Sequence, residues 1–247
     1  MAKRFAIHLV LLILLVGCGS INQGIQIESG ETVDRDLRTI NGSIEVGDGC
    51  EVRGNISNVN GTIRIGADSV VRGIQNVNGA IAIGSGSTAG PLETVNGPVS
   101  LGAGAVVNGS VSTVNGPTNL GVEARIAGDL SAVNGPLNLA PGSQVGGRVS
   151  TTNGSMRLEQ ARAGSLETTS GSVELLDGSV IEGLLRVRQV KPEPRERPSI
   201  VVGANVTVGG PLQFEQPVDL FIHETAQVGD IVGAEATIFS GESPDAL

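Results

Sequence analysis

The sequence repeats one short motif, and the spacing of that motif limits what the chain can fold into. Seven Asn-Gly pairs form a series with nearly equal intervals, and Ser170-Gly171 takes the eighth place in that series. A fixed period of about 20 residues is the signature of a solenoid, in which each repeat forms one coil. The motif asparagines are Asn41, Asn60, Asn78, Asn96, Asn115, Asn134 and Asn153.

Each repeat has the pattern of three short strands. Two aliphatic residues with one residue between them follow each Asn-Gly, as in Ile63 and Ile65, and this alternation predicts a strand with one buried face. A glycine such as Gly109 marks a second corner, and a third apolar stretch follows it at residues 111–114. Asn and Gly tolerate the backbone conformations of tight turns. We therefore expect three strands separated by corners in every repeat.

These observations predict an all-β fold, a single-stranded parallel β-helix (β-solenoid) with about 17–20 residues per coil. With a rise of about 4.8 Å per coil, ten or eleven coils would form a rod of roughly 50 Å. The β-helix could be left-handed or right-handed. Aliphatic residues at a period of six between Ile65 and Val107 are typical of left-handed β-helices, but the longer intervals later in the chain break that period. We favour the right-handed form.

The repeat pattern also divides the chain. We expect solenoid coils over residues 25–190, a Pro-rich charged loop over 191–198, two further and wider coils over 199–240, and a tail over 241–247. Three prolines interrupt the pattern in the loop, which is the reason for placing an excursion there. Three phenylalanines are expected to help close the C-terminal end of the core: Phe214, Phe221 and Phe239.

The first residues have the pattern of an export signal. Lys3 and Arg4 precede an apolar run of twelve residues, 5–16, which is shorter than the about 20 residues that a membrane-spanning helix needs. The run ends at Val16, and Gly17 and Cys18 follow it. This arrangement resembles the lipobox of bacterial lipoproteins, whose cysteine is diacylated and becomes the mature N-terminus. An ordinary signal peptide with an incidental cysteine is the alternative.

The lipobox resemblance implies a location. Residues 1–17 would be a lipoprotein signal peptide, Cys18 the lipidated residue carrying chains such as palmitate, and 18–24 a lipidated N-terminus with a short tether. Gly19 follows the cysteine, whereas Asp at that position marks the inner membrane in the Gram-negative sorting pattern. We therefore expect an exported protein, anchored by lipid to the bacterial cell envelope at the outer membrane.

The charge of the chain excludes one class of partner. The net charge is −9, and removal of Lys3 and Arg4 leaves 14 basic residues against 25 acidic ones, or −11. Nucleic acids bind to basic faces, so we expect no nucleic-acid partner. The local exception is a basic cluster that could contact phospholipid, lipopolysaccharide or a protein, or else remain solvated. It consists of Arg186, Arg188, Lys191, Arg195 and Arg197.

The residues that carry chemistry are few. His223, the one histidine after the leader, is expected to face outward, and Cys50 is expected to be a small wall residue. Acidic residues at the corners follow no fixed register from coil to coil, as calcium sites or glycosidase pairs would require. We therefore expect no catalytic residue, no metal, no cofactor and no enzymatic activity. The small residues in register with Cys50 are Ser69, Ser87, Ala105, Ala124 and Ser143, and the corner acids include Asp48, Asp68, Glu123 and Asp129.

The column of motif asparagines, Asn41 to Asn153, has a structural interpretation and a binding one. We expect the amides to stack and hydrogen-bond from coil to coil, satisfying backbone groups at the corner. The alternative is a row of sugar-binding or metal-binding side chains.

The pattern Ile-Gly-x-x-small-x-Val-x-Gly-x-Ile, as at residues 65–74 and 101–111, resembles the bactofilin family of polymer-forming cytoskeletal proteins. The resemblance implies a right-handed β-helix with about three strands per turn and end-to-end polymerisation without a nucleotide. Two departures are the export signal, since bactofilin cores are cytoplasmic, and the longer coil that the Asn-Gly corner produces. Repetitive adhesin-like solenoids of bacterial envelopes are similar as well.

Two functions follow from these resemblances. The first is a lipid-anchored scaffold of the envelope that self-associates. The second is a monomeric binding or adhesin-like module that presents a flat face to glycan or protein, although the chain lacks the tryptophan and tyrosine typical of sugar-binding faces.

Overall fold

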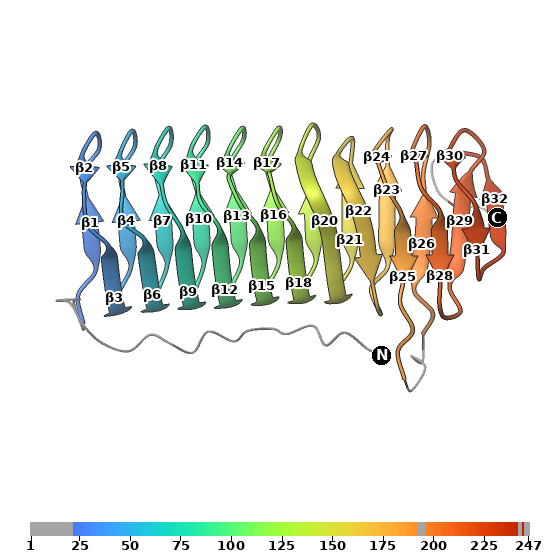
Figure 1. The fold of residues 1–247 in the computed structure, drawn as a ribbon, viewed down its shortest axis with the longest axis horizontal. Helices are drawn as coiled ribbons and strands as arrows, with labels where there is room; N and C mark the ends of the chain where they lie inside the picture. Colours follow the sequence, from blue (N-terminus) through green and yellow to red (C-terminus); the bar gives the residue numbers. More distant parts are fainter. Residues whose placement is uncertain (1–21, 192–195, 242–243, 245–247) are drawn as a thin grey trace.

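The described part of the chain is a stack of parallel β-coils (Figure 1). The computed structural model describes residues 22–191, 196–241 and 244. Their strands form one 12-stranded sheet and one 20-stranded sheet, and strands of successive coils pair in parallel. The predicted all-β parallel solenoid is confirmed, while its hand stays a prediction. Within these residues no helix is long and apolar enough to cross a membrane.

Several predicted segments lie outside the described residues. They are the signal peptide 1–17, the lipidation site Cys18, residues 192–195 of the Pro-rich loop, and most of the tail.

Each coil contributes to three walls. The first wall is the 12-stranded sheet: β1 (Ile25–Ile27), β4 (Ile44–Val46), β7 (Ile63–Ile65), β10 (Ile81–Ile83), β13 (Val99–Leu101), β16 (Thr118–Leu120), β19 (Leu137–Leu139), β21 (Met156–Glu159), β23 (Val173–Leu176), β26 (Ser199–Val202), β29 (Asp219–His223) and β32 (Ala236–Phe239). The second wall consists of two-residue strands: β2 (Thr32–Val33), β5 (Glu51–Val52), β8 (Val70–Val71), β11 (Thr88–Ala89), β14 (Val106–Val107), β17 (Arg125–Ile126), β24 (Val180–Ile181), β27 (Thr207–Val208) and β30 (Gln227–Val228).

The third wall holds the strands that lead into the Asn-Gly corner: β3 (Leu37–Asn41), β6 (Ile56–Asn60), β9 (Ile74–Asn78), β12 (Leu92–Asn96), β15 (Val111–Asn115), β18 (Leu130–Asn134), β25 (Leu185–Val187), β28 (Leu212–Phe214) and β31 (Ile231–Val232). Two long strands, β20 (Gln144–Asn153) and β22 (Arg162–Thr168), run from the second wall into the third and join the two walls into the 20-stranded sheet. We number the coils from the first wall, so that coil 1 begins at β1, coil 2 at β4 and coil 11 at β29.

The strands stack in register, each residue opposite its equivalent in the next coil. In the first wall Ile44 lies opposite Ile63, and partners up to β23 are separated by about the period of the sequence repeat. The next step is much longer, from Val173 to Ile200, because the predicted loop 191–198 leaves the stack between them. The sequence repeat is therefore the coil itself, and the loop is an insertion that does not disturb the register.

The prediction of two wider final coils is half wrong. Coil 10 runs from Ile200 to Leu220 and is wider than most, but coil 11 runs only from Leu220 to Ala236. The two coils differ in the corner that leads from the third wall to the next coil. This corner joins Ile231 to Ala236 in coil 11 and is shorter than the corresponding corner of coil 10, which joins Leu212 to Leu220.

The core lies between the walls and is filled by aliphatic side chains. Ile63 and Ile65 in β7 are buried while Arg64 between them is exposed, and the same alternation recurs along the first wall. One coil alone buries too few side chains to offset the ordering of its backbone, so the fold depends on coils covering one another. The regular period of the sequence is therefore also the source of stability.

The corner between the first and second walls requires a left-handed backbone in successive coils. Glycine supplies it at Gly49 and Gly86, with φ of 65° and 70°. Asp68 and Glu123 take the same position in coils 3 and 6, with φ of 51° and 58°. Such a conformation costs an ordinary residue about 1–2 kcal/mol. The corner conformation is thus imposed by the stack even where the local residue disfavours it.

At the Asn-Gly corner, glycine is required because there is no space for a side chain. A Cβ atom added to Gly97 would lie 2.1 Å from the carbonyl oxygen of Gly79 in the preceding coil, and one added to Gly116 would lie 2.4 Å from that of Gly97. The backbones of successive corners therefore touch, with no room for a side chain between them.

We expect Gly97→Ala to lower the free energy of unfolding by about 3 kcal/mol or more, because the added methyl group forces two stacked backbones apart. The matched control is Gly104→Ala at the first corner, where an added Cβ meets nothing within 4 Å but φ is +67°. That control should lose only about 1–2 kcal/mol. Denaturant unfolding of both variants tests the difference, and equal losses would contradict the contact argument.

Candidate functional site

The motif asparagines form a continuous hydrogen-bonded ladder along one corner of the stack. In each described step the Nδ2 atom donates to the Oδ1 atom of the preceding coil. The six distances from Asn60→Asn41 to Asn153→Asn134 are 2.9, 2.9, 2.8, 2.8, 2.8 and 3.0 Å. All amides therefore point the same way, an arrangement in which neighbouring hydrogen bonds polarise one another.

The ladder differs in two ways from the prediction. It begins one coil earlier, because Asn41 Nδ2 donates to Asn22 Oδ1 at 2.9 Å. The sequence signal was present, since Asn22 precedes Asn41 by one repeat, but its glycine, Gly24, comes one residue late. In addition, the ladder amides bond one another, and the corner backbone is paired by backbone groups, as in Gly42 N–H to Asn60 O at 3.0 Å.

A stripe of aliphatic side chains runs beside the ladder on the outside of the third wall. These residues directly precede the ladder asparagines and are half-buried or exposed: Ile40, Val59, Val77, Val95, Val114 and Val133. A parallel row of mostly polar residues borders the stripe: Ser57, Gln75, Glu93, Ser112, Ser131 and Ser150. We call the stripe, this row and the ladder the valine face. Its one charged residue in coils 2–7 is Glu93, which accepts a hydrogen bond from Gln75 at 3.3 Å.

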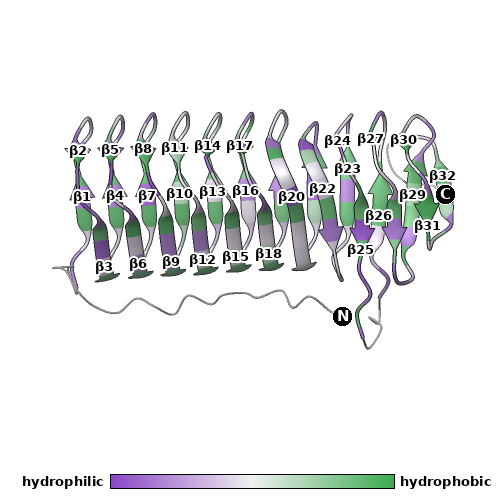
Figure 2. Ribbon diagram, in the orientation of Figure 1, coloured by the Kyte–Doolittle hydropathy of each residue, from purple (hydrophilic) through white to green (hydrophobic). Residues whose placement is uncertain are grey.

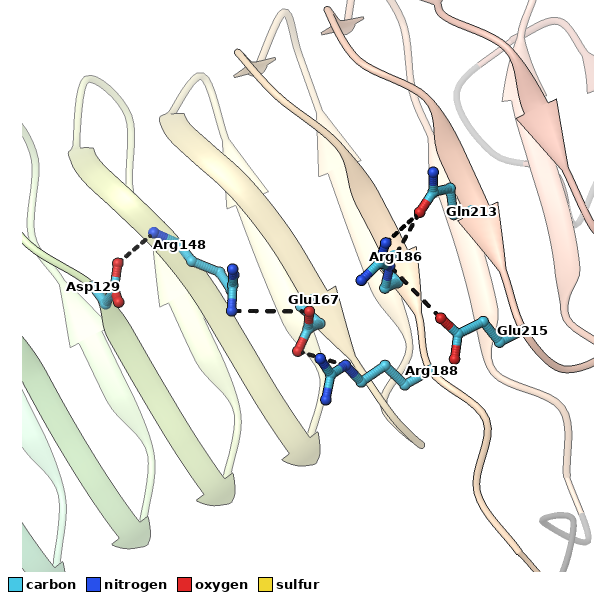
Figure 3. Close-up of polar contacts among 7 residues, drawn as sticks. All are labelled: Asp129, Arg148, Glu167, Arg186, Arg188, Gln213 and Glu215. Carbon is cyan, nitrogen blue, oxygen red and sulfur yellow. Dashed lines mark hydrogen bonds and ion pairs between the residues drawn. The ribbon is translucent and has the colours of Figure 1, made fainter. Parts of the chain in front are cut away.

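The valine face ends at a cluster of charged side chains (Figure 3). Glu167 is its centre, and although it lies on the outside of the third wall only 6% of its surface is exposed. Arg188 Nε lies 2.9 Å from Glu167 Oε1, and Arg148 Nη1 lies 4.0 Å from Oε2. The backbone N–H of Arg148 donates to Asp129 Oδ1 at 2.8 Å.

The predicted basic cluster is thereby largely neutralised. Arg186 donates to Gln213 Oε1 at 3.1 and 2.6 Å and lies 3.8 Å from Glu215 (Figure 3). Arg197 lies 3.8 Å from Asp219. Lys191 is exposed, and Arg195 lies outside the described residues. Three of the five predicted residues are therefore held by carboxylates of neighbouring coils.

The corner acids serve the stack itself. Asp48 Oδ1 accepts the backbone N–H of Ala67 at 2.7 Å, which satisfies a donor of the next coil. In the second wall Arg53 bridges Glu51 and Asp34, and its hydrogen bond to Glu51 lowers the pKa of that carboxyl below its ordinary value. Among the described residues no group of three or more His, Cys, Asp or Glu side chains could hold a metal ion.

Cys50 is buried in the column of small wall residues, as predicted. Its Sγ lies 3.0 Å from the carbonyl oxygen of Glu28, and its backbone N–H donates to Ser69 Oγ at 3.0 Å. The serine of the next coil repeats the arrangement, with Ser87 Oγ accepting from Ser69 N–H. The thiol therefore substitutes for a serine hydroxyl in a stacked corner.

The outward orientation expected for His223 is wrong. The residue is 8% exposed, its Nδ1 accepts the backbone N–H of Thr225 at 3.1 Å, and its ring meets Phe239 edge-on with centroids 5.1 Å apart. The alternation of β29 fails at its last residue because the ring turns into the corner, where Phe239 of the next strand covers it.

The C-terminal end of the core is open among the described residues. Ile238 pairs with the buried Ile222 and so occupies an inward position, yet 60% of its surface is exposed. Ile231, opposite the buried Leu212, is 37% exposed. Phe214 and Phe239 are buried and Phe221 half-buried, so the phenylalanines fill the last coils without covering their end. Figure 2 shows β31 coloured as hydrophobic at this end.

Comparisons with family models, with curated proteins and with solved structures found no match to this chain.

We expect Asn115→Ala to lower the free energy of unfolding by about 1 kcal/mol, because it removes two ladder hydrogen bonds at an exposed site. Asn108→Ala is the matched control, since Asn108 is an exposed asparagine of the same coil outside the ladder. Thermal unfolding followed by circular dichroism tests the pair, and an unchanged melting curve for Asn115→Ala would count against the ladder as a source of stability.

Proposed function

We propose that the protein is a non-enzymatic, lipid-anchored structural protein of the bacterial cell envelope that associates end to end through its C-terminal coil. The observation that carries the proposal is the end of the core formed by the last described strands, where Ile238 and Ile231 occupy inward positions and yet are 60% and 37% exposed. An exposed end of a parallel stack also presents unpaired strand edges, which template further strands.

The two ends of the stack are unequal, and this supports a head-to-tail contact. In coil 1 Leu37 is fully buried and Ile27 nearly so, and Thr39 Oγ1 donates to the carbonyl oxygen of Gln23 at 3.0 Å. At the other end the inward residues Ile231 and Ile238 are exposed. A contact between unlike ends is heterologous and builds an open chain of subunits. The bactofilin-like pattern of residues 65–74 agrees with such assembly.

The leader supports the anchoring part of the proposal. Residues 1–17 and Cys18 resemble a lipoprotein signal peptide with its lipidated cysteine, and the first strand begins at Ile25. Two or more acyl chains on one residue supply the stable anchoring that a single chain lacks. A tether of a few residues would hold the N-terminal coil near the outer membrane and leave the open C-terminal end facing away from it.

The valine face favours a second function, that of a monomeric binding or adhesin-like module. Over coils 2–7 this face carries one charged residue in a strongly acidic chain, with an aliphatic stripe between two polar rows. A flat surface of that kind suits a glycan or an extended protein partner. In this reading the open C-terminal end has no role.

The end-to-end proposal predicts the behaviour of residues 19–247 without lipid. We expect chains of rods in negative-stain images and fast-sedimenting species that Ile238→Asp abolishes, because a charge at an apolar contact opposes association. Val122→Asp is the control, since Val122 is 50% exposed but lies on the side of the stack. If the images of the unmodified chain show only single rods of about 50 Å, end-to-end assembly is contradicted and the binding module is favoured.

The anchoring proposal predicts that Cys18→Ser moves the protein from the membrane fraction to the soluble fraction of a Gram-negative host. Mass spectrometry of the unmodified protein should show a mature N-terminus at Cys18 carrying acyl chains. A soluble unmodified protein that keeps residues 1–17, or that begins elsewhere, would contradict the lipobox assignment.

A further inference from the structure

A buried row of polar side chains follows the inner side of the Asn-Gly corner. Its members face one another in register from coil 1 to coil 8, and all are at most 7% exposed. We call this row the inner corner column. It consists of Thr39, Asn58, Asn76, Thr94, Thr113, Ala132, Thr151 and Thr168.

The asparagines of the column bond to backbone carbonyls of the corner. Asn58 Nδ2 donates to the carbonyl oxygen of Gly42 at 2.9 Å, and Asn76 Nδ2 donates to those of Gly61 and Gly79 at 3.0 and 2.9 Å. The corner glycine carbonyls are therefore within reach of a donor that projects from this column.

The two ends of the column are satisfied by the shorter threonine. Thr39 Oγ1 donates to the carbonyl oxygen of Gln23 at 3.0 Å, and Thr168 Oγ1 accepts the backbone N–H of Gly171 at 3.0 Å.

The middle of the column is different. Thr94, Thr113 and Thr151 have Oγ1 atoms that are fully buried and have no hydrogen-bond partner among the described protein groups. The Oδ1 atoms of Asn58 and Asn76 are in the same condition. Buried hydroxyl and amide groups are nearly always hydrogen-bonded in native proteins, so five buried atoms without a partner in one row call for an explanation.

The two kinds of side chain differ in length. The amide nitrogen of asparagine lies one bond beyond the position that a threonine hydroxyl occupies. In coils 4, 5 and 7 the threonine hydroxyls make no hydrogen bond to a corner carbonyl, whereas in coil 8 Thr168 Oγ1 lies 3.3 Å from the carbonyl oxygen of Gly171. A water molecule at the place of the amide nitrogen would accept from the hydroxyl and donate to the carbonyl.

We propose that the inner corner column binds a file of water molecules in coils 4 to 7, bridging the threonine hydroxyls to the carbonyls of the corner glycines. Buried water occupies polar sites that offer two to four partners, and coils 4, 5 and 7 each offer a threonine hydroxyl and a corner carbonyl. The column contains no carboxylate, so neutral water leaves no uncompensated charge inside the core. The column residue of coil 6 is Ala132, whose small side chain leaves more space for the water molecules. Thr118 follows the Asn115-Gly116 corner, and its Oγ1 is likewise buried without a partner among the described groups, so it offers a further partner.

Substitution of Thr113 in the full chain, purified in detergent, distinguishes a hydrated column from a dry one. We expect Thr113→Val to lower the melting temperature by about 2–4 °C, because it removes a partner of the bound water. Thr113→Asn should melt no lower than the unmodified protein, because its amide takes the place of the water as in Asn58. Thr152→Val, an exposed change on the same wall, measures the general effect of replacing threonine by valine.

A Thr113→Val protein that melts at or above the temperature of the unmodified protein, after correction by Thr152→Val, means an unsatisfied hydroxyl and overturns the proposal. A crystal structure gives the direct result. We expect solvent peaks within about 3.2 Å of Oγ1 in Thr94, Thr113 and Thr151. Empty density at these atoms, or an anomalous peak there after a rubidium soak, would overturn the assignment to water.

Discussion

Parallel stacking in register governs the molecule, because it places every residue against its own equivalent in the next coil. A position is therefore occupied by residues that tolerate contact with copies of themselves. Glycine satisfies this at the Asn-Gly corner, where the Cα of Gly97 lies against the carbonyl oxygen of Gly79. Asparagine satisfies it beside that corner, because its amide is both donor and acceptor and each side chain can bond the next.

Charged residues meet the same constraint by alternation of sign. Equivalent positions of adjacent coils pair Glu45 with Arg64 and Arg157 with Glu174, at 3.3 and 2.5 Å. Around Glu167 the opposite charges come from diagonal positions, Arg148 of the preceding coil and Arg188 of the next. The basic stretch after Arg186 is therefore better understood as part of this pairing than as a bare cationic patch.

Much of the candidate site could be predicted because the period alone identifies equivalent positions. The regular spacing of the Asn-Gly motifs placed their asparagines in one column, and the self-complementary amides made a ladder the natural expectation. The same register assigned Cys50 to a small wall position. The predicted ladder did not include Asn22, because its glycine is displaced by one residue from the Asn-Gly pattern. The hydrogen bond to Asn41 needs only the asparagine.

The sequence by itself determined the coil, its three strands and the residues that face one another, since all of these follow from a local repeat. Only the tertiary structure decided what happens where the repeat lacks a neighbour or a partner. It buried His223 against Phe239, enclosed Glu167 between arginines of other coils, and left Ile238 inward yet exposed. It also left the hydroxyls of Thr94 and Thr113 buried without a hydrogen-bond partner among the described groups, whereas the Asn76 amide bonds two corner carbonyls. Burial and hydrogen bonding at these places depend on distances between coils, and a linear pattern of residue types carries no such distances.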